Sequence, residues 1–458
     1  MIDKMTLAEL KRIINDSEAA ELHEYIEEVN AIDIAVISED LDDRELWRLC
    51  QLLQDDDLAK VLEQASDIQR TRIAENITND ELIEVFGYMQ KDDIADLIGD
   101  MKYVQKKALL NQMMEDDRKI IRTLLNYPED SAGGIMTTAY IALDEKLTVE
   151  QGMRRIRQIA NKSEVIETIY IVDHSQSLVG VANLRDFLTA KKDDLLKDIM
   201  KVNPIYVHPE DDQEYAAKLV SKYDLNAIPV VNNRGSILGI ITVDDIIDVI
   251  VQEYNEDILE LGGVSSEENL NTTLWDSIRL RLPWLLVNLL TAFVASMTVK
   301  AFEGTIAKVV ALSATMTIVT GMGGNAGSQT QSILVRQLSQ DDVSLRKYTK
   351  SFIKEIMLGV VDGAINGLIT GIIVSVIYHN IYLGLIIFIA MIGNLVVAGV
   401  FGFLVPVALK RLGADPAVSS SIFITTATDV LGFFIFLGLA QLFLPLLIVK
   451  KPGIARLL

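Results

Sequence analysis

An aspartate stands in the middle of an apolar stretch near the C-terminus. Residues 422–439 read IFITTATDVLGFFIFLGL and contain Asp429. A carboxylate at bilayer depth is energetically costly and usually faces a bundle interior or a water-filled path. Thr425 lies four residues earlier, so its hydroxyl can share one helix face with the carboxylate, and Thr426 and Thr428 crowd the same turns. Mg²⁺ prefers such oxygen ligands, so we expect a divalent-cation site here. The alternative is a buried aspartate satisfied by helix caps or by a lysine of a neighbouring helix.

Charge is divided unevenly along the 458 residues. The chain has 42 Lys and Arg against 64 Asp and Glu, a net charge of −22. Residues 1–282 hold 30 of the basic and 57 of the acidic residues, a net charge of −27, and the remainder is mildly basic. An acidic body argues against nucleic acid as a partner, because phosphate binding needs a surplus of Lys and Arg. It suits the capture of cations.

Cysteine content and the N-terminal residues give further limits. Cys50 is the only cysteine and falls in a helical pattern, which leaves neither a disulfide framework nor a thiolate metal site. Residues 1–22 lack the apolar core of a signal peptide, so we expect the N-terminus and the acidic body in the cytosol.

Residues 1–130 are expected to form a cytosolic, acidic helical domain. Apolar residues recur at spacings of three and four, and a loose repeat of 20 to 30 residues begins at Asp-rich positions, which predicts a helical superhelix. Aspartates at helix starts are ordinary N-caps. The group formed by Asp92, Asp93 and Asp96 is denser than capping alone requires.

Residues 131–250 show short β-branched strands alternating with helices, in two similar copies. Met136 corresponds to Met200, Gly180 to Gly239, and Asp186 to Asp245. This tandem α/β unit resembles a pair of cystathionine-β-synthase-type (CBS) domains. The resemblance implies a sensor that binds a small regulator, with ATP as one candidate, and Asp186 stands where a ribose contact is common in such modules.

Residues 251–270 are predicted to be a connecting, or plug, helix and its linker. The helical pattern runs over residues 248–263, carries Glu253, Glu256, Asp257 and Glu260 at spacings of three and four, and ends on two glycines. A solvated acidic face is the simpler interpretation. Its place between the sensor pair and the first membrane span favours a role as lever or plug.

Residues 271–458 are predicted to be a membrane domain with five helices. Five spans from a cytosolic N-terminus would put the C-terminus outside, and most Lys and Arg of the connecting loops then fall in the cytosol. The expected spans are residues 283–302, 306–335, 353–378, 381–408 and 418–448.

The second span contains the polar, glycine-rich stretch TIVTGMGGNAGSQTQS, residues 317–332. Four glycines among Asn, Ser and Gln predict a break in the helix, and non-helical backbone at this depth is tolerated only where it is buried in protein or lines a cavity. A pure packing motif is the alternative. The oxygen of Asn325 could contact a hydrated cation.

The motifs GMGGNAGSQ, TDVLGFF and RLGADPA, together with the order of the upstream regions, resemble the MgtE family of magnesium channels and transporters. The resemblance covers nearly the whole chain. It implies a homodimer in the plasma (bacterial inner) membrane with Mg²⁺ passing at the subunit interface, lined by the second and fifth spans. The pore carboxylate falls on Asp429, Asn325 lies in the matching glycine motif, and Thr425 shares the Asp429 face. Ser421 stands where the family carries a pore-facing Asn, and Asp415 matches an acidic residue near the cytosolic mouth.

The resemblance further implies a gate that intracellular Mg²⁺ closes through carboxylates of the cytosolic regions. The expected sensor residues come from the first helical domain, the second CBS repeat and the connecting helix, and are Asp92, Asp93, Asp96, Glu214, Asp224, Asp245, Asp248, Glu253, Glu256 and Asp257.

Other functions were weighed against this one. A secondary transporter that couples Mg²⁺ to Na⁺ or H⁺ would also need broken helices and an acid at the membrane midplane. An intramembrane aspartyl protease would need Asp362 and Asp429 as a carboxylate pair, but the sequence before Asp429 is TAT instead of the expected GxG. A CBS-regulated transporter of an organic or anionic solute is disfavoured by the acidic residue in the path. The chain is therefore expected not to be an enzyme.

Overall fold

The computed structural model describes residues 5–16, 18–28, 30–160, 163–265, 268, 272–340, 345–417 and 420–448. The chain divides into two compact units, Met1–Val251 and Gln252–Leu458. Each unit is described by itself.

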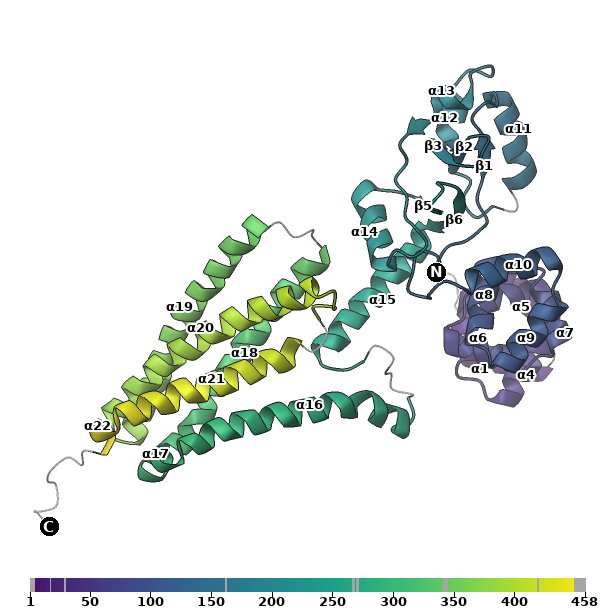
Figure 1. The fold of residues 1–458 in the computed structure, drawn as a ribbon. Coiled ribbons are helices and arrows are strands. Elements are labelled where there is room, and N and C mark those ends of the chain that lie inside the picture. Colours follow the sequence, from purple (N-terminus) through teal and green to yellow (C-terminus); the bar gives the residue numbers. More distant parts are fainter. Residues whose placement is uncertain are drawn as a thin grey trace, which may run out of the picture. The chain divides into compact units, whose positions relative to one another are not determined.

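The first part of the N-terminal unit consists of short helices of seven to ten residues (Figure 1). Asp42 and Thr78 each begin a helix with a capping box. By contrast, the N-cap of α8 is Gln90, so Asp92 and Asp93 lie inside the first turn of that helix and do not cap it. The helices are α1 (Leu7–Asp16), α2 (Ala19–Glu28), α3 (Ala31–Ser38), α4 (Asp43–Leu52), α5 (Asp55–Glu63), α6 (Asp67–Glu75), α7 (Asn79–Val85), α8 (Lys91–Asp100), α9 (Tyr103–Gln112) and α10 (Glu115–Leu124).

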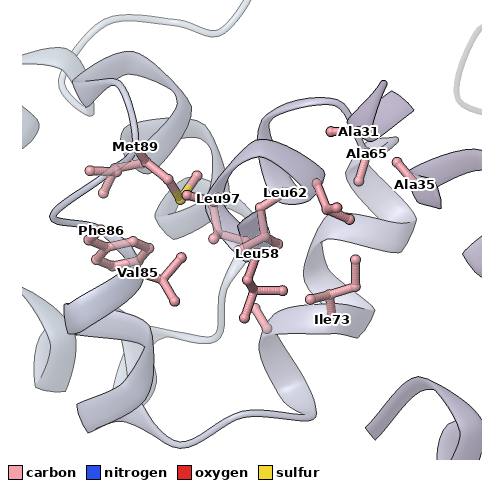
Figure 2. Close-up of a cluster of buried hydrophobic side chains, with 14 of the residues drawn as sticks. Ala31, Ala35, Leu58, Leu62, Ala65, Ile73, Val85, Phe86, Met89 and Leu97 are labelled. Carbon is pink, nitrogen blue, oxygen red and sulfur yellow. The ribbon is translucent and has the colours of Figure 1, made fainter. Parts of the chain in front are cut away.

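These helices pack in a regular order. Each odd-numbered helix from α1 to α9 contacts the next odd-numbered one, and the even-numbered helices do the same from α4 to α10. Figure 2 shows Leu62 of α5, Ile73 of α6 and Leu97 of α8 meeting in the shared interior, where all three are buried. Burial of one such side chain stabilises the fold by about 1.5–3 kcal/mol. The apolar residues that recur at spacings of three and four therefore form the buried inner face of a stack of helices.

The second part of this unit is a pair of similar α/β repeats. β1, β2, β3 and β4 form one sheet in that order, with β1 and β2 parallel, and β5 and β6 form an antiparallel pair. The elements are β1 (Ala142–Asp144), α11 (Val149–Ile159), β2 (Thr168–Val172), β3 (Leu178–Asn183), α12 (Leu184–Thr189), α13 (Leu196–Ile199), β4 (Lys201–Val202), α14 (Gln213–Tyr223), β5 (Ala227–Val231) and β6 (Ile237–Thr242).

The two repeats exchange their first extended segments. β4, which begins the second repeat, pairs with β3 of the first, and Thr137 of the first repeat bridges to Ile240 on β6 of the second. The paired glycines of the sequence lie at these crossings. A Cβ at Gly180 would lie 2.5 Å from Sδ of Met200, and one at Gly239 would lie 3.0 Å from Sδ of Met136. Both glycines are therefore required by the close approach of the exchanged segment.

The connecting helix does not start as a separate element. It is the second half of α15 (Val243–Leu261), which begins directly after β6 and ends before Gly262 and Gly263. Gly263 has a φ of +74°, the left-handed conformation that commonly ends a helix. One continuous helix thus contains both the last helical residues of the second CBS repeat and the acidic residues of the predicted plug.

The second unit is dominated by long helices, and α18, α20 and α21 pack against one another while α19 packs on α20 (Figure 1). Four helices are long and apolar enough to cross a membrane: α16, α19, α20 and α21. α18 has 30 residues but is too polar to meet the same criterion, so the count of five spans is not confirmed. The helices are α16 (Leu274–Ala301), α17 (Glu303–Lys308), α18 (Ala311–Gln340), α19 (Leu345–Ile377), α20 (Ile381–Arg411), α21 (Ser420–Leu442) and α22 (Leu444–Ile448).

The prediction of a helix break in residues 317–332 was wrong, because α18 is helical throughout this stretch. Its glycines instead allow neighbouring helices to come close. A Cβ at Gly327 would overlap the side chain of Ile424 on α21 and lie 3.8 Å from Cβ of Ala398 on α20. Packing thus compensates for the weak intrinsic helix propensity of glycine.

Candidate functional site

The face of α21 that carries Asp429 is lined by oxygen atoms. Ser421, Thr425 and Asp429 follow one another at intervals of four residues, and Thr425 is exposed while the other two are half-buried. Thr426 and Thr428 instead donate to carbonyl oxygens of their own helix, at 2.6 Å and 3.1 Å. Among the described residues, Asp429 has no ion pair or hydrogen bond. The alternative of a lysine-neutralised carboxylate is thus not supported by this part of the chain.

A second polar face runs along α18. Asn325, Ser328 and Gln329 are exposed, whereas Gly323 and Gly327 point inward and are buried against α20 and α21. Amide and hydroxyl groups cannot be left toward lipid without a large desolvation cost. The glycine motif therefore has two faces, one for helix packing and one polar and uncovered.

The opposite side of α21 has a different character. A cavity of about 530 Å³ opens there between α16, α20 and α21 and is lined almost wholly by apolar side chains, including Phe401, Phe423 and Val430. The hydroxyl of Thr426, also in this lining, is already donated to the carbonyl of Ile422. A cation would find no free ligand in that cavity, so the Asp429 face is the only one of these two sides suited to an ion.

A buried acid of this unit was not recognised from the sequence. Glu355 of α19 is buried, and its Oε2 accepts a hydrogen bond from the hydroxyl of buried Thr330 on α18, at 2.9 Å. Glu355 falls at the start of the expected span 353–378, where no local pattern pairs it with Thr330. Asp362, the partner proposed for a protease-type carboxylate pair, lies further along α19, and the described side chains show no contact between it and Asp429.

Three aspartates of α8 lie in a crowded acidic cluster of the first unit. Asp92 Oδ1 accepts a hydrogen bond from the hydroxyl of Thr137, at 3.1 Å, which ties the helical domain to the first CBS repeat. Burial, and then the charge of Asp93, raises the pKa of Asp92 to about 7. Burial, and then the charge of Glu63, raises the pKa of Asp93 to about 7 as well. Partial desolvation raises the pKa of Asp96 to about 6, although 54% of its side chain is exposed and Arg70 opposes the change.

Sequence reasoning missed Glu63, Glu164 and Arg70 in this cluster. Burial, followed by the charge of Asp92, raises the pKa of Glu164 to about 7. Arg70 is buried, and its Nη1 lies 3.9 Å from Oδ2 of Asp96. These residues come from α5, from the loop before β2 and from α6, so no local pattern links them to α8. A charge density that favours cations is the common property of the cluster.

Only some of the predicted sensor residues of the second CBS repeat belong to the acidic cluster around α8. Asp245 belongs to the cluster: burial raises its pKa, while the hydroxyl of Thr242, which donates to its Oδ2 at 2.5 Å, has the opposite effect. Asp248 is exposed on the same helix. Glu214 forms an ion pair with Lys218 of its own helix, at 2.7 Å, and Asp224 is exposed at the C-cap of α14.

Asp186 has a structural explanation. Its Oδ2 accepts a hydrogen bond from the backbone N–H of Asn183, at 2.8 Å, in the capping box of α12. Asp245 occupies the same position relative to the start of α15 and bonds to Thr242. The repeated aspartate is therefore explained in the first place by the helix start that each repeat requires.

The acidic half of α15 lies near the turn before α21. Glu253, Glu256 and Asp257 are half-buried there. Burial, and then the charge of Asp415, raises the pKa of Glu260 to about 7. Asp415 is exposed, and its Oδ1 accepts from the backbone N–H of Ala417 in a tight turn. Within the second unit, the acidic half of α15 therefore brings negative charge close to Asp415.

Across the described residues, no group of three or more His, Cys, Asp and Glu side chains is arranged to hold a metal ion. The polar faces of α18 and α21 would supply one carboxylate with neutral oxygens instead. Such a set suits Mg²⁺, which keeps several waters and uses one or two carboxylates.

The comparisons with known proteins identify the family of each region of the chain. Residues 29–130 match the MgtE intracellular N domain, residues 132–193 and 196–252 match CBS domains, and residues 316–439 match MgtE, a divalent cation transporter. The magnesium transporter MgtE of Bacillus subtilis is 30% identical over 335 residues, which cover 73% of this chain and 74% of that protein. The chain belongs to the MgtE family.

Other MgtE relatives give the same result. The magnesium transporter MgtE of Thermus thermophilus is 34% identical over 332 residues, 71% of this chain and 73% of that one. A crystal structure of the cytosolic domain of the Mg²⁺ channel MgtE in complex with ATP is also similar, with 30% sequence identity and a TM-score of 0.51. The match covers 53% of this chain and 100% of the chain in that crystal structure. MgtE relatives are transporters, which confirms that a membrane transporter and not an enzyme is encoded here.

Proposed function

We propose that this MgtE-family member is a Mg²⁺ channel for magnesium uptake whose ion path lies along the polar faces of α18 and α21. The observation that carries the proposal is the stripe of Ser421, Thr425 and Asp429, which the rest of the described chain covers only in part. An acid at bilayer depth is stable only toward protein or water, and its neutral oxygen neighbours match a hydrated Mg²⁺. Asn325 of α18 would add an amide oxygen.

A second copy of the chain would cover both polar faces and complete the path. In such a homodimer α18 would be the fifth span, because its polar side would face the path instead of lipid. Five spans place the C-terminus outside the cell and the charged turn with Asp415 at the cytosolic mouth. We further propose domain limits at residues 1–130, 131–250, 251–270 and 271–458.

The cytosolic regions would act as the gate. The acidic cluster around Asp92, Asp93 and Asp245 crowds carboxylates that repel one another when ionised. Mg²⁺ bound among them, and among the acids of α15, would stabilise the compact arrangement and close the path. A ligand shifts such an equilibrium only by its different affinity for the two states, and several weak sites together give a steep response. The sensor set is Asp92, Asp93, Asp96, Glu214, Asp224, Asp245, Asp248, Glu253, Glu256 and Asp257.

ATP is a proposed regulator of the CBS pair. The support is the solved cytosolic domain of an MgtE channel in complex with ATP, which aligns along its whole length with this chain. Asp186 is the candidate ribose contact, although its Oδ2 also caps α12. Binding of ATP to purified protein, with Asp186→Asn as the comparison, tests this point.

Recording from inside-out membrane patches tests the main proposal. A channel gives unitary currents that fall as Mg²⁺ on the cytosolic side rises, and Asp429→Ala should abolish them. Coupled Mg²⁺/Na⁺ or Mg²⁺/H⁺ exchange gives no unitary openings and depends on the second ion, so that result would favour the secondary-transporter alternative. Normal uptake by the Asp429→Ala protein would refute the ion path.

A further inference from the structure

Asn394 lies inside the membrane unit, on α20, between α18 and α21. Its side chain is completely buried, and its Nδ2 donates to the carbonyl oxygen of Val319 on α18, at 2.7 Å. Because a carbonyl oxygen can only accept, this bond fixes which end of the amide is the nitrogen. The other end, Oδ1, is buried and has no hydrogen-bond partner among the described residues.

Two glycines make the space that this amide occupies. A Cβ at Gly323 of α18 would overlap Nδ2 of Asn394. A Cβ at Gly432 of α21 would lie 2.6 Å from its Oδ1. Real Cβ atoms do not approach other atoms so closely. Gly323 and Gly432 therefore form a slot, with one wall on each of the two helices that carry the polar faces.

The slot is next to the proposed ion path. Gly432 follows Asp429 by three residues, so Ser421, Thr425, Asp429 and Gly432 lie along one side of α21. The unpaired Oδ1 of Asn394 is directed at this last position, about one helical turn from the Asp429 carboxylate. Leaving a buried acceptor unpaired costs about 1–3 kcal/mol, which an apolar side chain of similar size would avoid. The amide therefore points to a polar role beyond filling space.

We propose that Asn394 is a positioning residue of the ion path. Its amide fills the slot between Gly323 and Gly432, ties α20 to the backbone of α18, and sets the spacing of the two helices whose polar faces meet the ion. Its Oδ1 accepts a hydrogen bond from an internal water that lies between the slot and Asp429. This inference rests on the ion path proposed above, since it concerns the spacing of the same two helices.

The slot predicts a specific suppression experiment, measured as initial Mg²⁺ uptake into vesicles and corrected for the amount of folded protein. Gly323→Ala should reduce uptake roughly tenfold or more, because displacements near 1 Å can have effects of this size. Asn394→Ala removes the atoms that the new methyl group meets. The double variant should transport faster than Gly323→Ala alone, at about the rate of Asn394→Ala.

Independent sites would give a different result, namely a double variant whose defect is the product of the two single defects. That outcome would overturn the proposal. Gly324→Ala is the matched control, because a Cβ at Gly324 meets no atom of the described chain within 4 Å. Asn394→Ala should not relieve any defect that Gly324→Ala produces.

A second variant tests the polar role. Asn394→Leu keeps the approximate volume of the side chain but removes both the bond to Val319 and the free Oδ1. We expect the KM for Mg²⁺ to rise several-fold while the folded protein keeps its thermal stability in detergent. A residue needed only for packing would change stability or abundance without changing the KM of the remaining protein. Wild-type KM and rate in Asn394→Leu would overturn the proposal.

Asp429→Ala in the same assay distinguishes a failure of the proposed ion path from a failure of the positioning role of Asn394. If Asp429→Ala abolishes uptake while the Asn394 variants fail the tests above, only the positioning role is wrong. If Asp429→Ala transports normally, the ion path is wrong and the role of Asn394 falls with it.

Discussion

The two acidic regions of this protein are built on opposite plans. In the cytosolic cluster, Asp92, Asp93 and Glu164 are half-buried close together, and this burial, with the charge of neighbouring carboxylates, raises their pKa values. On the membrane face, Asp429 is a single acid accompanied by neutral oxygens. A crowded group of carboxylates is stable only when cations or protons neutralise it, so its stability depends on the concentration of those cations or protons. A single carboxylate among neutral ligands binds weakly enough for an ion to leave again, which conduction requires.

Removing the single membrane acid should have the largest effect. We expect Asp429→Ala to abolish Mg²⁺ uptake, because the remaining hydroxyl and amide oxygens supply no charge against the desolvation of a divalent ion. Uptake measured with a Mg²⁺-sensitive dye in proteoliposomes checks this. Asp362→Asn on α19 is the control and should transport normally. Equal loss in both variants would contradict the idea of one decisive acid.

Removing carboxylates from the cytosolic cluster should change the inhibition of transport by internal Mg²⁺ but not transport itself. Asp245→Ala combined with Asp248→Ala should shift the internal Mg²⁺ concentration for half-inhibition about tenfold upward, within the usual range of coupling between sites. Patch recordings with stepped cytosolic Mg²⁺ measure the shift. Glu150→Gln removes an acid that pairs with Arg154 elsewhere in the CBS pair and should leave inhibition unchanged. Unchanged inhibition in the double variant would show that this cluster is not the sensor.

Protons should partly replace Mg²⁺ in the cytosolic cluster. The folded pKa values of Asp92, Asp93 and Glu164 are raised to about 7, so between their ordinary values and pH 7 the compact state binds protons that the open state does not. Its stability therefore falls as pH rises through this window. In EDTA, the linker after α10 should resist protease better at pH 6 than at pH 8. Asp92→Asn should flatten this difference, and an unchanged pH dependence would contradict the assignment.

The smallest effect is expected at Asp186. Asp186→Ala removes one half of the capping box of α12 and should lower the free energy of unfolding of the CBS pair by about 1 kcal/mol. Chemical denaturation of the full-length protein in detergent, followed by a fluorescent label on the CBS pair, measures this change. Mg²⁺ uptake without ATP should stay at the wild-type level, in contrast to Asp429→Ala.

Much of the fold could be predicted because its signals are local. Apolar spacing located the short helices, and the correspondence of Met136 with Met200 and of Gly180 with Gly239 revealed the tandem repeat. The structure explains why these pairs stand out: each methionine packs against the glycine of the other repeat. Because such a close contact restricts the residue type, the same residues recur at matching positions of both repeats and can be recognised in the sequence.

The errors and omissions have a common cause in tertiary packing. The glycines of residues 317–332 suggested a broken helix, but α20 and α21 pack on them and keep α18 intact. Asn394 was not singled out from the sequence, because only its neighbours in the fold reveal the slot. Glu164 joined the acidic cluster from a loop, where no periodicity marks its direction. Asp429 could be singled out because the cost of a carboxylate in an apolar stretch is visible from the sequence itself.

The exchange of first segments between the two CBS repeats has a consequence for how this region can be divided. Neither half owns a complete sheet, since β4 belongs to the sheet of the first half and Thr137 bridges to the second. A gene fragment cut at residue 194 would leave each product with an unpaired edge and an empty groove beside Gly180 or Gly239. The two repeats should therefore fold only together, and a conformational change in one repeat should also change the other.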